Sequence, residues 1–78
     1  MKPENKIPLI LIQNLLAQYT NDTDPEGVFD AAWYMWKRYC YRHHIHDIPF
    51  FTQTRKKGWL TRAQANQFWK YMTGKKRF

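Results

Sequence analysis

The sequence contains no serine, a single cysteine and only three glycines, none of them adjacent. Without serine there is no Ser-His-Asp nucleophile, and isolated glycines cannot form a glycine-rich phosphate loop. One cysteine, Cys40, allows no internal disulfide, which fits a reducing cytoplasm. Acidic residues are few, and no two of them are placed to act together in a cleft. We therefore expect a cytoplasmic protein that is not an enzyme and holds no cofactor.

Long hydrophobic runs are also missing. The one nearly continuous apolar segment, Ile7–Leu16, is interrupted by Gln13 and Asn14. It is too short to cross a bilayer, which takes about 20 residues. Glu4 precedes it and no small-x-small cleavage pattern follows it, so it does not resemble a signal peptide. This segment predicts a core helix, and we expect no membrane partner.

Aromatic residues, in contrast, are abundant: four Trp, five Tyr and five Phe. Each buried ring removes roughly 150–250 Å² from water, so a few rings can build a core without disulfides or metal. Disordered chains are poor in such residues. We expect residues 1–78 to form a single small domain, with a basic tail at 74–78. The sequence leaves the oligomeric state open.

Hydrophobic periodicity predicts an all-α fold in which each helix buries one apolar stripe. The expected elements are three helices, at about residues 8–19, 25–44 and 62–73. The segment 46–60 shows no helical period, and we expect an irregular basic loop there. The alternative for this segment is a short hairpin with Phe51–Thr54 and Trp59–Leu60 as its strands.

Local signals mark the ends of two of these helices. Asp24 is suited to the N-cap of the second helix and Pro25 to its first position. Thr61 and Gln64 fit a capping box at the start of the third helix, and Gly74 fits its end. These signals fix where the helices begin and end more firmly than periodicity does.

Negative charge is nearly absent from the second half of the chain. The first 36 residues carry two lysines and five acidic residues, a net charge of −3. Residues 37–78 carry 11 of the 13 Lys and Arg and one acidic residue, Asp47, a net charge of +10. So much positive charge on a small protein attracts polyanions, of which nucleic acid is the commonest in a cell. The pattern predicts a nucleic-acid partner, DNA or RNA, or an acidic protein surface.

Three groups of basic residues carry this charge. The first is the outer face of the second helix, where cations that suit phosphates alternate with rings that suit bases. It comprises Tyr34, Lys37, Arg38, Tyr41 and Arg42. The other two groups are Arg55, Lys56 and Lys57 in the expected loop, and Lys75, Lys76 and Arg77 in the tail. Such groups are also typical of faces that only solvate a domain, and this alternative stays open.

The open face of the third helix offers a different kind of contact, from Arg62, Asn66 and Lys70. Arg and Asn pair bidentately with guanine and adenine edges, so this face could read a groove between two basic clusters. The alternative is an amphipathic packing helix with a polar outside.

A metal site can be drawn near the end of the second helix. Cys40 and His44 are four residues apart there, and His46 and Asp47 follow. On a helical wheel, however, Cys40 faces the core while His44 faces outward. Since no second cluster completes a ligand set, we expect a buried cysteine, ordinary histidines and no metal site.

Nucleic-acid binding by a small basic protein is the leading hypothesis. Its rival is a standalone protein-binding module, such as a virus- or plasmid-encoded inhibitor or accessory subunit that docks on an acidic surface of a larger host protein. Trp, Tyr and Arg dominate the hot spots of such interfaces. On the rival hypothesis Ile10, Tyr34 and Tyr41 are the anchors, because all three are predicted on open faces.

Overall fold

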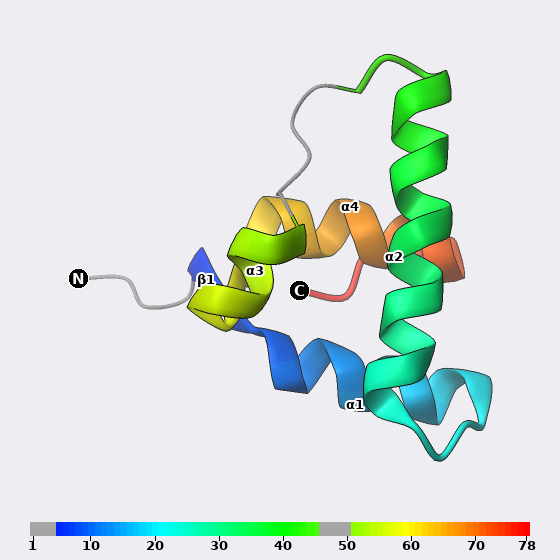
Figure 1. Cartoon of the computed structure of the whole chain (residues 1–78), viewed down its shortest axis with the longest axis vertical. Coiled ribbons are helices and arrows are strands. Elements are labelled where there is room, and N and C mark those ends of the chain that lie inside the picture. Colours follow the sequence, from blue (N-terminus) through cyan, green and yellow to red (C-terminus); the bar gives the residue numbers. More distant parts are fainter. Residues whose placement is uncertain (1–4, 46–50) are drawn as a thin grey trace.

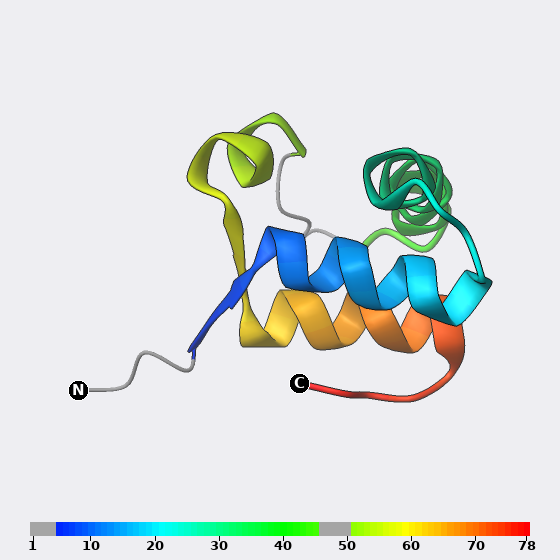
Figure 2. The same cartoon turned by 90° about the horizontal axis from the view of Figure 1, so that it is seen from below.

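The computed structural model describes residues 5–45 and 51–78, which form four helices and one pair of strands. Their order is β1 (Lys6–Pro8), α1 (Leu9–Thr20), α2 (Pro25–Arg42), α3 (Phe51–Lys57), β2 (Trp59–Thr61) and α4 (Arg62–Thr73). α1 and α4 lie side by side and run in the same direction (Figures 1 and 2). α2 crosses their C-terminal halves, and α3 lies near the strand end on the same side. The prediction of a small all-α domain is confirmed.

The strand pair joins the starts of α1 and α4. The strands are antiparallel, and the register places Lys6 opposite Thr61, Ile7 opposite Leu60 and Pro8 opposite Trp59. Because side chains alternate along a strand, Ile7 and Leu60 turn inward together, and both are buried. The backbone N–H of Leu9 donates to the carbonyl of Gly58 at 2.8 Å and continues the pairing into the first turn of α1.

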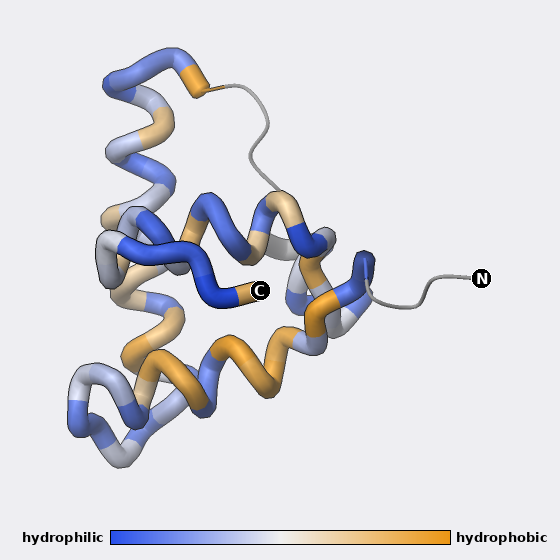
Figure 3. Tube along the Cα trace, turned by 180° about the vertical axis from the view of Figure 1, so that it is seen from behind, coloured by the Kyte–Doolittle hydropathy of each residue, from blue (hydrophilic) through white to orange (hydrophobic). Residues whose placement is uncertain are grey.

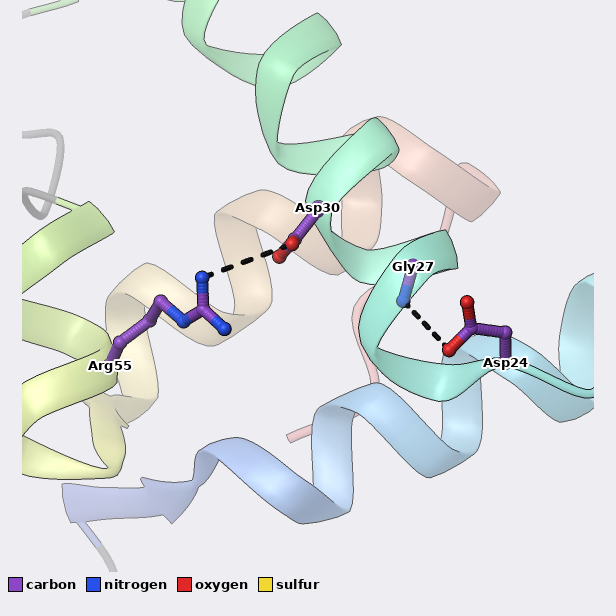
Figure 4. A network of polar contacts seen from close by, with 4 residues as sticks. All are labelled: Asp24, Gly27, Asp30 and Arg55. Atoms are coloured by element: carbon purple, nitrogen blue, oxygen red, sulfur yellow. Dashed lines mark hydrogen bonds and ion pairs between the residues drawn. The ribbon is translucent and has the colours of Figure 1, made fainter.

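The helix ends form as the local signals predict. The Asp24 side chain accepts a hydrogen bond from the backbone N–H of Gly27 at 3.1 Å (Figure 4), with Pro25 in the first position of α2. Thr61 and Gln64 make both hydrogen bonds of the capping box, at 3.2 and 3.1 Å. These side chains satisfy backbone N–H groups that a helix leaves without partners.

Aromatic rings of α2 and α4 fill the core. Phe29 and Phe68 are fully buried, with ring centroids 5.3 Å apart. The Phe68 ring also lies 6.0 Å from the ring of Trp33 and 6.2 Å from that of Trp36. α1 closes the core from below with Ile12, which is fully buried. The core therefore depends on large rings, as the composition predicts.

The expectation for residues 46–60 is wrong in two respects within its described part. Residues 51–57 form helix α3 rather than a loop or a strand. Trp59–Thr61 is a strand, but its partner is β1 and not Phe51–Thr54, so there is no hairpin here. The pairing joins segments about fifty residues apart, which a local pattern cannot reveal. Residues 46–50 lie outside the described part of the chain.

Two further expectations need correction. α1 begins at Leu9, because Pro8 belongs to β1, and α2 ends at Arg42 rather than at residue 44. His44 has φ 56°, a left-handed conformation that ends the helix. Helical spacing also predicts that Leu11, Tyr19 and Met35 lie on the buried stripes of the first two helices, but all three are exposed.

Candidate nucleic-acid interface

The basic and aromatic face of α2 is open along its length. Tyr34 is 61% exposed and Tyr41 is 76% exposed. Lys37, Arg38 and Arg42 are exposed between and beside them. The guanidinium of Arg38 lies 5.9 Å from the centroid of the Tyr34 ring. The predicted group on the second helix is therefore brought together on the surface, with its cations and rings interleaved.

An ion pair shows which way this face points. Arg55 of α3 extends toward Asp30 of α2, with 3.9 Å between Nη1 and Oδ2 (Figure 4). Asp30, Tyr34, Lys37 and Tyr41 follow one another at helical spacings of four, three and four residues, so they lie on one side of α2. The stripe that contains both tyrosines therefore lies on the side of α2 that looks toward α3.

The basic residues of α3 lie on the same side of the molecule. Of residues 53–57, only Thr54 is buried, while Arg55, Lys56 and Lys57 are exposed. α2 and α3 both stand on one side of the α1 and α4 pair (Figures 1 and 2). Two of the three predicted groups thus share a side. We call these eight residues the α2–α3 surface: Tyr34, Lys37, Arg38, Tyr41, Arg42, Arg55, Lys56 and Lys57.

The basic tail lies on the opposite side. Residues 74–78 fold back along the side of α4 that faces away from α2 and α3 (Figures 2 and 3). The side-chain oxygen of Asn66 accepts hydrogen bonds from the backbone N–H groups of Arg77 and Phe78, at 3.2 and 2.7 Å. The Phe78 ring packs edge-on against Trp69 at 5.8 Å. Lys75, Lys76 and Arg77 remain exposed but are separate from the α2–α3 surface.

The three residues predicted to read a groove have different surroundings. Arg62 donates a hydrogen bond from Nη1 to the backbone oxygen of Phe78 at 2.8 Å. Asn66 holds the tail as described above, so both polar groups already have partners within the chain. Lys70 is exposed on the same helix. No local signal reveals these bonds, because each joins residues at least eleven positions apart.

Three of the four described acidic residues lie at the start of α2, and the fourth, Asp30, pairs with Arg55. Asp22 and Asp24 lie in the loop before α2, and Glu26 in its first turn, where negative charge suits the helix dipole. Asp22 accepts a hydrogen bond from the backbone N–H of Asp24 at 2.9 Å. Within residues 5–45 and 51–78, the ion pair of Asp30 with Arg55 is the only one. The cations of α2 therefore produce a positive potential that no nearby carboxylate in this part of the chain neutralises.

The hypothetical metal ligands do not come together within the described residues. Cys40 is buried, while His44 is exposed after the end of α2. In the described part of the chain, no three His, Cys, Asp or Glu side chains are grouped to hold an ion. His46 and Asp47 fall outside that part. Burial raises the pKa of the Cys40 thiol above its ordinary value of 9.0, because the thiolate would lose its hydration.

Cys40 is expected to resist thiol reagents while the protein is folded. Its side chain is inaccessible, and its raised pKa makes the reactive thiolate scarcer than in the unfolded chain. At about pH 8, DTNB should label the folded protein at least about 100-fold more slowly than the protein in guanidinium, since labelling requires opening of the core. Equal rates in the two solvents would contradict the burial of this side chain.

The same shift gives a direction for stability against pH. The folded-state pKa of Cys40 is the higher one, so the thiol contributes its full stability below the unfolded pKa, near 9. That contribution is lost as the pH rises from there through the folded-state pKa. Urea midpoints measured across this range should therefore fall with increasing pH.

One arrangement near the strand pair was missed by the sequence analysis. The ammonium groups of Lys6 and Lys57 lie 4.8 and 4.6 Å from the ring centroid of Trp59. Lys57 was a candidate residue, but Lys6 and Trp59 were not. The strand register brings Lys6 to this ring from the other end of the chain, and nothing in the local sequence indicates it.

Comparisons with other proteins add no further information. The chain matches no protein-family model, no curated protein and no solved structure. Across the described ranges, no helix has both the length and the apolar character needed to cross a membrane. The side chains and their arrangement are therefore what indicates a function.

Proposed function

We propose that the protein binds nucleic acid, DNA or RNA, through the α2–α3 surface. The observation that supports this most strongly is that two of the basic groups lie on one side of the fold. Six of the eight residues are cations, and among them only Arg55 forms an ion pair with a described carboxylate. A polyanion laid across this side would meet cations from both α2 and α3.

Each residue type has a separate role in this proposal. Lys37, Arg38 and Arg42 on α2 contact phosphates, as do the three cations of α3. Tyr34 and Tyr41 offer ring faces on which bases or sugars stack. The tail cations lie on the other side and contribute to the general attraction of a polyanion rather than to this contact.

In this proposal the protein binds its partner without catalysing a reaction, and it acts in the cytoplasm. The buried single cysteine agrees with a reducing compartment. Its function would be to coat, hold or position a nucleic acid. Binding would depend little on sequence, because phosphate contacts carry no sequence information and aromatic stacking tolerates every base.

Salt dependence of binding tests this proposal. If four to six phosphates are neutralised, the slope of log K against log salt should be about −3.6 to −5.4 on duplex DNA. Affinity should then fall by roughly 100- to 2,000-fold between 50 and 200 mM salt. Fluorescence anisotropy of labelled oligonucleotides measures the binding constant at each salt concentration. A binding constant that stays flat over this range would rule the proposal out.

A second candidate is the protein-binding module, and the apolar surface of α1 favours it. Ile10 is 66% exposed and Leu11 is 42% exposed, which is unusual for large aliphatic side chains next to each other. A virus- or plasmid-encoded inhibitor could dock such residues, with Tyr34 and Tyr41, on a host protein. A pull-down that still returns one stoichiometric protein after nuclease treatment would favour this candidate, whereas nucleic-acid binding predicts that the captured material is lost.

A further inference from the structure

The ring of Trp59 is in contact with two lysines that are distant from each other in sequence. Lys6 is in β1 and Lys57 ends α3, yet their ammonium groups lie 4.8 and 4.6 Å from the same ring centroid. The two charges are therefore within about 10 Å of each other, which is about one Debye length at 0.1 M salt. They therefore repel each other beside the indole.

The strand register explains why these side chains meet. Lys6 pairs with Thr61, and Trp59 is two residues before Thr61, so Lys6 and Trp59 lie diagonally on one face of the strand pair. This is the outer face, because Ile7 and Leu60 occupy the inner one. Gly58, with φ 82°, makes the turn that sets Lys57 beside the ring, in a conformation that favours glycine.

The ring is the accessible tryptophan of the molecule. Trp33, Trp36 and Trp69 are 3–5% exposed, whereas Trp59 is partly exposed and both of its lysines are exposed. Neither lysine forms an ion pair with a carboxylate in the described residues. A partly exposed indole with two ammonium groups beside it, neither of them paired with a described carboxylate, matches a nucleotide unit, which combines a flat base with a phosphate.

We propose that Trp59, Lys6 and Lys57 form a site for single-stranded nucleic acid. An unpaired base stacks on the indole in place of one lysine, and both ammonium groups bind the flanking phosphates. Unpaired bases expose the faces that stacking needs, whereas bases in a duplex cover those faces with their neighbours. DNA and RNA share this chemistry.

This inference rests on the proposed function and makes it more specific. Lys57 belongs to the α2–α3 surface, so the Trp59 site extends that surface toward the strand pair. A strand that crosses α2 and α3 would end on the indole. The structure therefore favours single strands over duplexes as the partner.

Tryptophan fluorescence reports on this site selectively, because the other three indoles are buried. Oligodeoxyuridine, oligouridine and a duplex of the same length should be titrated into the protein, because the two single strands differ only in the 2′-hydroxyl. Either single strand should quench the emission and the duplex should not; the difference between the two single strands identifies the sugar. Replacement of the fluorophore, Trp59→Phe, should abolish the quenching signal. Equal quenching by the duplex, or no quenching by either single strand, would overturn the proposal.

Affinity measured by anisotropy gives a readout independent of the fluorophore. Trp59→Thr keeps a strand-forming residue and removes the ring, and it should weaken single-strand binding by about 5- to 150-fold. Lys57→Gln, at an exposed position that leaves the fold intact, should reduce the salt slope by about 0.7. The matched control, Lys75→Gln in the tail, should change the slope by less.

The outcomes separate this inference from the proposed function. Suppose that oligonucleotides bind with a steep salt slope, but that Lys57→Gln changes this slope no more than Lys75→Gln does and the indole emission stays unchanged. The Trp59 site is then wrong, and the proposed binding at the α2–α3 surface stands. If no oligonucleotide binds at low salt, both are wrong. Both proposals are supported if Trp59→Phe loses the quenching and Lys57→Gln lowers the salt slope, while Lys75→Gln keeps the quenching and changes the slope by less.

Discussion

Replacement of Phe68 by alanine is expected to lower the free energy of unfolding by about 3–5 kcal/mol. Phe68 is fully buried and its ring contacts Phe29, Trp33 and Trp36. Loss of the ring removes its transfer free energy and leaves a cavity among three rigid aromatic side chains. A domain of this size has a total stability of about 4–12 kcal/mol, so the variant should be largely unfolded on gentle heating.

Urea denaturation followed by circular dichroism measures this effect. Tyr41→Ala is the matched control, because it also removes an aromatic ring but from a side chain that is 76% exposed. Its free energy of unfolding should change by no more than about 0.5 kcal/mol. Similar losses in the two variants would contradict the placement of Phe68 at the centre of the core.

Neutralisation of the α2 cations is expected to have the largest effect on binding. The triple variant Lys37→Gln, Arg38→Gln and Arg42→Gln removes three proposed phosphate contacts. On duplex DNA the salt slope should fall by about 2.7, with affinity at 0.1 M salt about 100-fold weaker or more. All three side chains are exposed on α2, so the fold should be retained.

The tail offers a control with the same change in charge. Lys75→Gln, Lys76→Gln and Arg77→Gln also lower the net charge by three, but on the side of α4 away from α2 and α3. If net charge alone determined the affinity for nucleic acid, both variants would lose the same amount of affinity. A loss due to direct phosphate contacts on the α2–α3 surface should be several-fold larger in the α2 variant.

The parts of the fold predicted from the sequence are those that depend on neighbouring residues. The capping box of Thr61 and Gln64, the Asp24 cap and the Gly74 end all act within one helical turn. α4 consequently has the predicted bounds, 62–73. The exposure of Ile10 was also predicted, because it follows directly from helical spacing.

The parts that were missed depend on distant contacts. The pairing of β1 with β2 joins segments about fifty residues apart, and each strand has only three residues, too few for an alternating pattern to be recognised. Residues 53–57, the part of α3 whose side chains are described, form no apolar stripe, since Thr54 alone is buried among them. Its helical form depends on its surroundings more than on its own periodicity.

The same division applies to the candidate site. The residues on α2 could be predicted, because one helix face places them together. Tertiary structure, which a local pattern does not reveal, puts α3 with Arg55, Lys56 and Lys57 on the same side as α2 (Figures 1 and 2). It also puts the tail on the other side. The bonds that tie Asn66 to the tail were likewise beyond a sequence pattern.

The salt slope of nucleic-acid binding, measured for the unmodified protein and both triple variants, tests the central claim most directly. We predict a slope of about −3.6 to −5.4 on duplex DNA for the unmodified protein, a loss of about 2.7 in the α2 variant and a loss below about 1 in the tail variant. Equal losses in the two variants, or a larger loss in the tail variant, would contradict binding at the α2–α3 surface. A flat slope for the unmodified protein on both duplex and single-stranded oligonucleotides would contradict nucleic-acid binding altogether.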